Sequence, residues 1–137
     1  MSAYLLDTNV VKELRKTDRA DPKVLAWFER VEESQLFLSV LVLGQIRRGI
    51  EKARRTDLPK ARALEQWLNG LERGYAERLL PVTAAVAAWW GRLSAIRPIS
   101  TVDGLLAATG LVYDLTLVTR NAPDIAHTGV RLLNPFE

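Results

Sequence analysis

Three aspartates stand where their carboxylates could carry out chemistry. Asp7 directly follows a short apolar run, whereas Asp103 and Asp124 lie in the first turns of two later predicted helices. Each one alone could simply stabilise the start of a helix, by about 0.3–1 kcal/mol. If the three converge, however, they repel one another unless a cation neutralises them. A hard divalent ion held by such oxygens would polarise a phosphoryl oxygen and lower the pKa of an attacking water, which is the chemistry of phosphodiester hydrolysis.

The composition limits which metal such a site could hold. The 137 residues include one histidine and no cysteine. A disulfide scaffold, a thiolate zinc site, an iron–sulfur cluster and a cysteine nucleophile are therefore excluded. A single histidine also excludes a zinc or iron site built from several histidines of one chain. Any bound metal must be held mainly by oxygen, so we expect Mg²⁺ or Mn²⁺.

Short apolar runs alternate with helix-like segments along the chain. The runs predict strands at residues 3–6, 36–38, 79–80, 115–118 and 130–133. Helices are predicted at residues 10–15, 40–54, 58–75 and 101–112, with others beginning at residues 22, 84 and 122. Apolar strands separated by helices are typical of a parallel sheet covered on both faces. We therefore predict one α/β domain over residues 1–137, a three-layer α/β/α sandwich with a central, mostly parallel sheet.

This architecture indicates where the three aspartates should lie. Ligands of open parallel sheets bind at the carboxyl ends of the strands, near the switch in strand order. Asp7 and Asp124 each follow a predicted strand, and Asp103 begins a helix. We expect all three to converge on that edge of the sheet.

Four segments carry a resemblance to a known family. They read Leu-Leu-Asp-Thr-Asn-Val at residues 5–10, Gly-Gln-Ile-Arg-Arg-Gly-Ile at 44–50, Val-Asp-Gly-Leu-Leu-Ala-Ala-Thr at 102–109, and Leu-Val-Thr-Arg-Asn-Ala-Pro-Asp-Ile at 117–125. In this order they resemble the PIN-domain ribonucleases that act as VapC-type toxins in bacterial type II toxin–antitoxin systems. The resemblance implies a Mg²⁺- or Mn²⁺-dependent endoribonuclease that a cognate antitoxin neutralises. It also implies a homodimer that contacts DNA only through the antitoxin.

The resemblance assigns roles to individual positions. It implies four acidic positions around the metal, and Asp7, Asp103 and Asp124 fall on three of them as expected metal ligands. Thr119 and Asn121 fall on polar positions that line the same site, although Asn121 could also be a helix cap. A haloacid-type phosphatase, which also uses an aspartate after its first strand, is disfavoured because its second aspartate is replaced by asparagine here.

The fourth acidic position departs from the family pattern, because Gln45 stands where glutamate is expected. An amide oxygen can still bind a metal, but one negative charge and any proton-accepting role are lost. Changes to the partners of metal ligands commonly cost 10–100-fold in affinity or activity, and a change at the ligand position should cost at least about as much. We therefore expect impaired catalysis. The alternative is a catalytically inactive PIN-fold module that binds antitoxin or RNA.

The positive charge is concentrated in one part of the chain. The net charge is +3, yet residues 47–62 contain seven basic residues against two acidic ones, a local net charge of +5. Such a stretch is either a solvated helix face or a surface that follows the RNA backbone. We predict RNA binding for four of its arginines: Arg47, Arg48, Arg54 and Arg55.

The chain shows no sign of membrane insertion or export. Its longest stretches without a charged residue span 13 residues, whereas a bilayer-spanning helix needs about 20. The N-terminus lacks the basic start of a signal peptide. We expect a cytoplasmic protein.

Overall fold

The computed structural model describes residues 2–137, and its centre is a five-stranded parallel sheet in the order β3-β2-β1-β4-β5. The strands are β1 (Tyr4–Leu6), β2 (Leu36–Ser39), β3 (Leu79–Leu80), β4 (Thr116–Val118) and β5 (Leu132–Leu133). The first strand in sequence therefore lies in the middle of the sheet. The strand order switches there, because β2 and β3 extend the sheet on one side of β1 and β4 and β5 extend it on the other.

Seven α-helices accompany the strands within residues 2–137. They are α1 (Thr8–Arg15), α2 (Pro22–Arg30), α3 (Val40–Arg54), α4 (Leu58–Gly74), α5 (Ala84–Ile96), α6 (Thr101–Tyr113) and α7 (Ala122–Ile125). Each of the seven predicted helices and five predicted strands is present, with ends shifted by at most two residues. No helix in this part of the chain combines the length and apolar character that a bilayer crossing requires.

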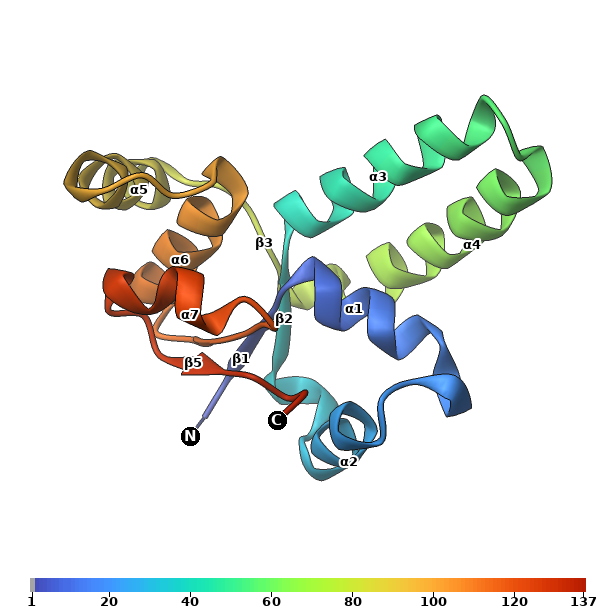
Figure 1. The fold of residues 1–137 in the computed structure, drawn as a ribbon, viewed down its shortest axis with the longest axis horizontal. Helices are drawn as coiled ribbons and strands as arrows, with labels where there is room; N and C mark the ends of the chain where they lie inside the picture. Colours follow the sequence, from blue (N-terminus) through green and yellow to red (C-terminus); the bar gives the residue numbers. More distant parts are fainter. Residues whose placement is uncertain (1) are drawn as a thin grey trace.

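The helices cover both faces of the sheet, as Figure 1 shows, so the predicted three-layer sandwich is confirmed. The buried side chain of Leu6 belongs to the core beneath α1–α4, whereas that of Leu5 belongs to the core beneath α5–α7. Neighbouring residues of β1 thus serve opposite layers, as the alternation of side chains along a strand requires. The α3 and α4 helices form a long hairpin that projects beyond the sheet (Figure 1).

Side-chain caps fix where the helices that border the site begin. Asp7 caps α1 by accepting the backbone N–H of Thr8, and Ser39 caps α3 by accepting that of Leu41. Ser100 caps α6 by accepting the backbone N–H of Asp103 at 3.2 Å. Such caps satisfy N–H groups that lack partners inside the helix. Because α1 and α3 directly follow the parallel strands β1 and β2, both helices begin at the same edge of the sheet.

Candidate active site

A hollow of about 450 Å³ lies between the first turns of α1 and α6 and one side of α3. Ten residues line it: Asp7, Thr8, Asn9, Lys12, Gln45, Arg48, Gly49, Lys52, Asp103 and Asn121. Its floor is the carboxyl end of β1, next to the carboxyl end of β4. This is the edge at which parallel sheets bind ligands. We call this hollow the acidic–basic pocket because both kinds of side chain line it.

Asp7 is held in one orientation by three donors. One carboxylate oxygen accepts the backbone N–H of Thr8 at 2.7 Å. The other accepts the hydroxyl of Thr119 at 2.7 Å and the side-chain amide of Asn9 at 3.3 Å. Asp7 is only 4% exposed, and Thr119 is fully buried. The carboxylate is therefore fixed before any ligand arrives.

The surroundings of Asp7 raise the pKa of its carboxyl above the ordinary value. Burial is the main cause, because removal from water disfavours the charged form. The hydrogen bonds from Thr119 and Thr8 oppose this effect, and the nearby Asp103 carboxylate adds to it. Asp7 and Asp103 both line the acidic–basic pocket. A cation between them would relieve their repulsion.

Gln45 lies on α3 and closes another side of the pocket. The side-chain hydroxyl of Thr8 donates a hydrogen bond to its amide oxygen. Thr8 thus makes two contacts in the pocket: its backbone N–H donates to the capping carboxylate of Asp7, and its hydroxyl donates to the residue at the position where the family pattern has glutamate.

The remaining predicted site residues do not all reach the pocket. Asn121 lines it and occupies the N-cap position of α7, but its side chain makes no capping hydrogen bond. Thr119 is not among the lining residues; its hydroxyl donates to Asp7 and accepts the backbone N–H of Asn121 at 3.0 Å. Asp124 is exposed in the first turn of α7 and is not among the lining residues. The structure therefore brings two of the three predicted carboxylates to the pocket.

The donor set can hold a hydrated magnesium ion. Within residues 2–137, no group of three or more histidine or acidic side chains lies close enough to hold a metal. Mg²⁺, however, commonly keeps several waters and binds one or two carboxylates together with substrate phosphates. Asp7 and Asp103 supply two carboxylates, and the amide of Asn121 supplies a neutral oxygen, whereas the amide oxygen of Gln45 already accepts the hydroxyl of Thr8. These residues fit the ion only when water or a phosphate completes its coordination.

Three cationic side chains share the pocket with the two carboxylates. Lys12 comes from α1, and Arg48 and Lys52 come from α3. None of the three forms an ion pair within the described residues. Of the three, only Arg48 is among the arginines that the sequence predicts to bind RNA. Helical spacing could have found Lys52 as well, because positions 45, 48 and 52 follow the i, i+3, i+7 pattern of one helix face.

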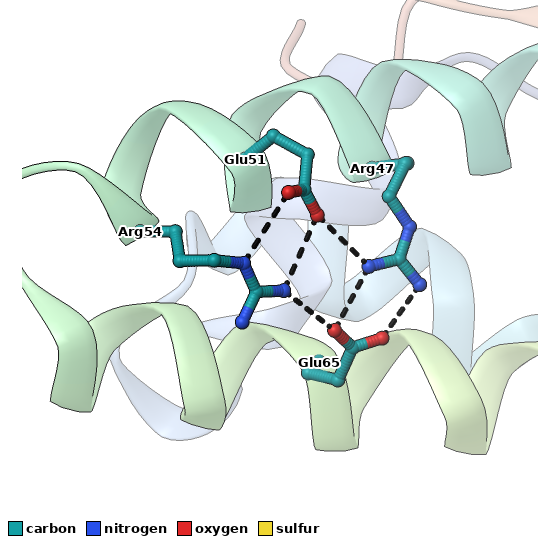
Figure 2. A network of polar contacts seen from close by, with 4 residues as sticks. All are labelled: Arg47, Glu51, Arg54 and Glu65. Atoms are coloured by element: carbon teal, nitrogen blue, oxygen red, sulfur yellow. Dashed lines mark hydrogen bonds and ion pairs between the residues drawn. The ribbon is translucent and has the colours of Figure 1, made fainter.

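Two of the predicted RNA-binding arginines, Arg47 and Arg54, lie in an ion-pair network between α3 and α4, shown in Figure 2. Glu65 of α4 accepts two hydrogen bonds from Arg47, at 2.8 and 2.5 Å, and one from Arg54 at 3.0 Å. Glu51 bridges the same two arginines from α3. The contacts with Arg47, and then with Arg54, lower the pKa of Glu65 to about 2. The network joins α3 to α4, while Arg55 lies exposed at the C-cap of α3.

A second hollow, of about 420 Å³, lies on the other side of α1, toward α2 and α4. Its lining is almost entirely apolar: Leu6, Val11, Leu14, Phe28, Val31, Leu36, Trp67, Leu71 and Tyr75, with Glu33 as the one acidic residue. We call it the apolar groove.

Comparison with known proteins places this fold and pocket in a family. The model of the PIN domain matches residues 4–129. The chain belongs to the PIN-domain family. It is 28% identical to the VapC ribonuclease Y4jK of Sinorhizobium fredii, over 97% of each chain, and 28% identical to Toxin FitB of Neisseria gonorrhoeae, over 96% of this chain and 97% of FitB.

Solved structures of this PIN-domain family agree with the sequence matches. The crystal structure of FitAcB from Neisseria gonorrhoeae superposes with a TM-score of 0.85 at 27% identity, covering 98% of this chain and 99% of that one. DNA-bound VapBC from Salmonella typhimurium superposes with a TM-score of 0.78 at 19% identity, over 98% and 99% of the two chains. The latter likeness establishes the fold alone.

Proposed function

We propose that this PIN-domain chain is a VapC-type toxin, a Mg²⁺- or Mn²⁺-dependent endoribonuclease whose activity is impaired by Gln45. The observation that carries the proposal is the pairing of Asp7 and Asp103 across one pocket, with Gln45 on its third side. Two relatives that match nearly the whole chain are named as a ribonuclease and a toxin. Their names support this function.

Each pocket residue would have a separate role in phosphodiester hydrolysis. A bound divalent ion would supply Lewis-acid polarisation of a phosphoryl oxygen. Asp7 and Asp103 would hold that ion, and Thr119 keeps the Asp7 carboxylate in position. Arg48 and Lys52 would hold the RNA backbone beside it, because both are exposed and lie on the pocket wall. Gln45 lacks the charge and the proton affinity that a glutamate would bring to this place.

Restoring the glutamate tests this proposal. The Gln45→Glu variant should cleave a mixed RNA substrate in Mn²⁺ at least about tenfold faster than the chain with Gln45, because one lost ligand charge costs about that much or more. EDTA should abolish the gain. Gln66→Glu is the matched control, since it makes the same change at an exposed position of α4 outside the pocket. No gain at position 45, with both variants folded, would contradict the proposed role of this residue.

A second candidate function is a PIN-fold module that binds RNA or antitoxin without turnover. Gln45 and the three cations of the pocket favour it, because they weaken metal binding and strengthen anion binding. The same experiment separates the two candidates. If neither form cleaves RNA in Mn²⁺ but both bind it, the binding module is the better description.

We propose further that an antitoxin segment covers the apolar groove. The solved relatives include toxin–antitoxin complexes such as FitAB and VapBC. The groove would offer such a segment an apolar surface next to α1, whose opposite side borders the acidic–basic pocket. Leu14→Glu should weaken co-purification with the antitoxin, whereas Lys23→Glu, on the exposed face of α2, should not. Equal co-purification by both variants would place the antitoxin elsewhere.

A further inference from the structure

We propose that the acidic–basic pocket binds a phosphate group directly, in the absence of any divalent metal, with Gln45 as one of its hydrogen-bond donors. This inference rests on the proposed function, because it assigns a ligand to the same pocket. It differs in its chemistry, however, since an anion rather than a cation would be the first ligand to bind.

The charge of the pocket supports an anion. Lys12, Arg48 and Lys52 contribute three positive charges against the two carboxylates of Asp7 and Asp103, so the lining carries a net charge of +1. A glutamate at position 45 would reduce that charge to zero. The three cations have no acidic partner within residues 2–137, unlike Arg47 and Arg54, which are held by glutamates. They are therefore available to a ligand.

The orientation of Gln45 supports an anion as well. Its amide oxygen accepts the hydroxyl of Thr8, so the oxygen that could bind a metal is already engaged. The amide nitrogen makes no hydrogen bond to another residue among those described, and it is not sealed away from solvent. A side-chain amide nitrogen offers two N–H donors and no acceptor. Gln45 thus offers the pocket donor groups, where a glutamate would offer only acceptors.

The three cations come from two helices that line the same hollow. Lys12 lies one helical turn beyond Thr8 on α1, while Arg48 and Lys52 lie one and two turns beyond Gln45 on α3. The two helices thus line facing walls of one hollow of about 450 Å³. A guanidinium and two ammonium groups around a phosphate make charge-assisted hydrogen bonds, which are roughly twice as strong as neutral ones. RNA ends and internal phosphodiesters both carry this chemistry.

Binding in EDTA tests the proposal without any cleavage step. The probes are adenosine 5′-monophosphate and two otherwise identical fluorescent oligoribonucleotides, one with a 5′-phosphate and one with a 5′-hydroxyl. We expect all three to bind the natural chain. Tighter binding of the phosphorylated oligonucleotide would assign the pocket to RNA ends, and equal binding of the two would assign it to internal phosphodiesters. Absence of binding of all three probes would overturn the proposal.

Substitutions locate the binding in the pocket. Arg48→Ala and Lys52→Ala should each weaken binding of the monophosphate by about tenfold, the effect expected of one hydrogen bond to a charged group. Lys23→Ala, which removes an exposed cation of α2 outside the pocket, is the matched control. Equal binding by all three variants would show that general surface charge is responsible, and would overturn the proposal.

Gln45→Glu separates this inference from the proposed function. In EDTA, this variant should bind the monophosphate at least about tenfold more weakly, because it exchanges donors for a negative charge. Unchanged binding in EDTA would refute the donor role of Gln45. The proposed nuclease function fails on a different measurement, the absence of Mn²⁺-dependent cleavage by the same variant.

Discussion

Replacing Thr119 by valine removes one hydroxyl from a fully buried site and leaves the volume of the side chain nearly unchanged. The variant loses the 2.7 Å hydrogen bond to Asp7, which leaves that carboxylate oxygen with Asn9 at 3.3 Å, and it no longer accepts the backbone N–H of Asn121 at 3.0 Å. A hydrogen bond to a charged group contributes about 1.5–3 kcal/mol. With an unfolding entropy of about 2.1 cal/mol/K per residue, a chain of 137 residues should lose about 5–10 °C in Tm.

The same substitution should loosen the carboxylate that we propose as a metal ligand. We expect Mn²⁺ affinity to fall about 10–100-fold, the usual cost of removing a partner that orients a ligand. The assay is calorimetric titration of Mn²⁺ in the Gln45→Glu background, with thermal unfolding measured by circular dichroism.

Thr109→Val provides the matched control for this prediction. Thr109 is also fully buried, but its hydroxyl donates only to the carbonyl of Leu105 in its own helix, at 2.7 Å. Such a bond adds little to a helix. If the two valine variants match in both Tm and Mn²⁺ affinity, the bond from Thr119 has no special role.

Three further predictions concern the scaffold. Glu65→Gln should lower Tm at pH 7. Because the pKa of Glu65 is lowered, its carboxylate stabilises the fold only while it is ionised, so the difference in Tm should disappear as pH falls from 4.5 toward 2. A difference in Tm that persists at low pH would contradict this. Gly110→Ala should lower the free energy of unfolding by about 1–3 kcal/mol in denaturant, because its Cβ would lie 2.6 Å from Val130. Gly70→Ala should instead raise it by up to about 1 kcal/mol, because nothing lies within 4 Å of a Cβ at that helical position. Trp89, 39% exposed on α5, should lie in a contact between two copies, so Trp89→Glu should shift sedimentation toward the monomer; a monomeric natural chain would refute this.

The sequence predicted the order and type of the elements because its local signals agree with the fold. Asp21-Pro22 begins α2, and Ser39 and Thr83 cap α3 and α5, each at the expected residue. The last strand is shorter than predicted. Val130 is apolar because it packs in the core against Gly110, and its N–H bonds to the hydroxyl of Thr128 rather than to the sheet. Composition alone cannot separate core packing from strand pairing.

The site was only partly predictable for a different reason. Asp7 and Asp103 lie at ends of elements, where the topology of a parallel sheet decides the location. The roles of Arg47 and Arg54 depend instead on Glu65, which reaches them only because α4 folds back along α3. No pattern within residues 47–62 distinguishes paired arginines from free ones. The side on which Asp124 lies depends on how a single-turn helix is placed, which the sequence does not specify.

Asp7 and Gln45 differ in how many hydrogen bonds of the fold depend on their side chains. Asp7 is buried, begins α1 and receives hydrogen bonds from Thr8, Asn9 and Thr119, so a change there disturbs the start of a helix. Gln45 lies within α3, and its side chain bonds only to Thr8 among the described residues. Codons for glutamine and glutamate differ at a single base. Under the function that we propose, one point mutation at position 45 would therefore change the activity of the enzyme and leave the hydrogen bonds that fix the start of α1 in place.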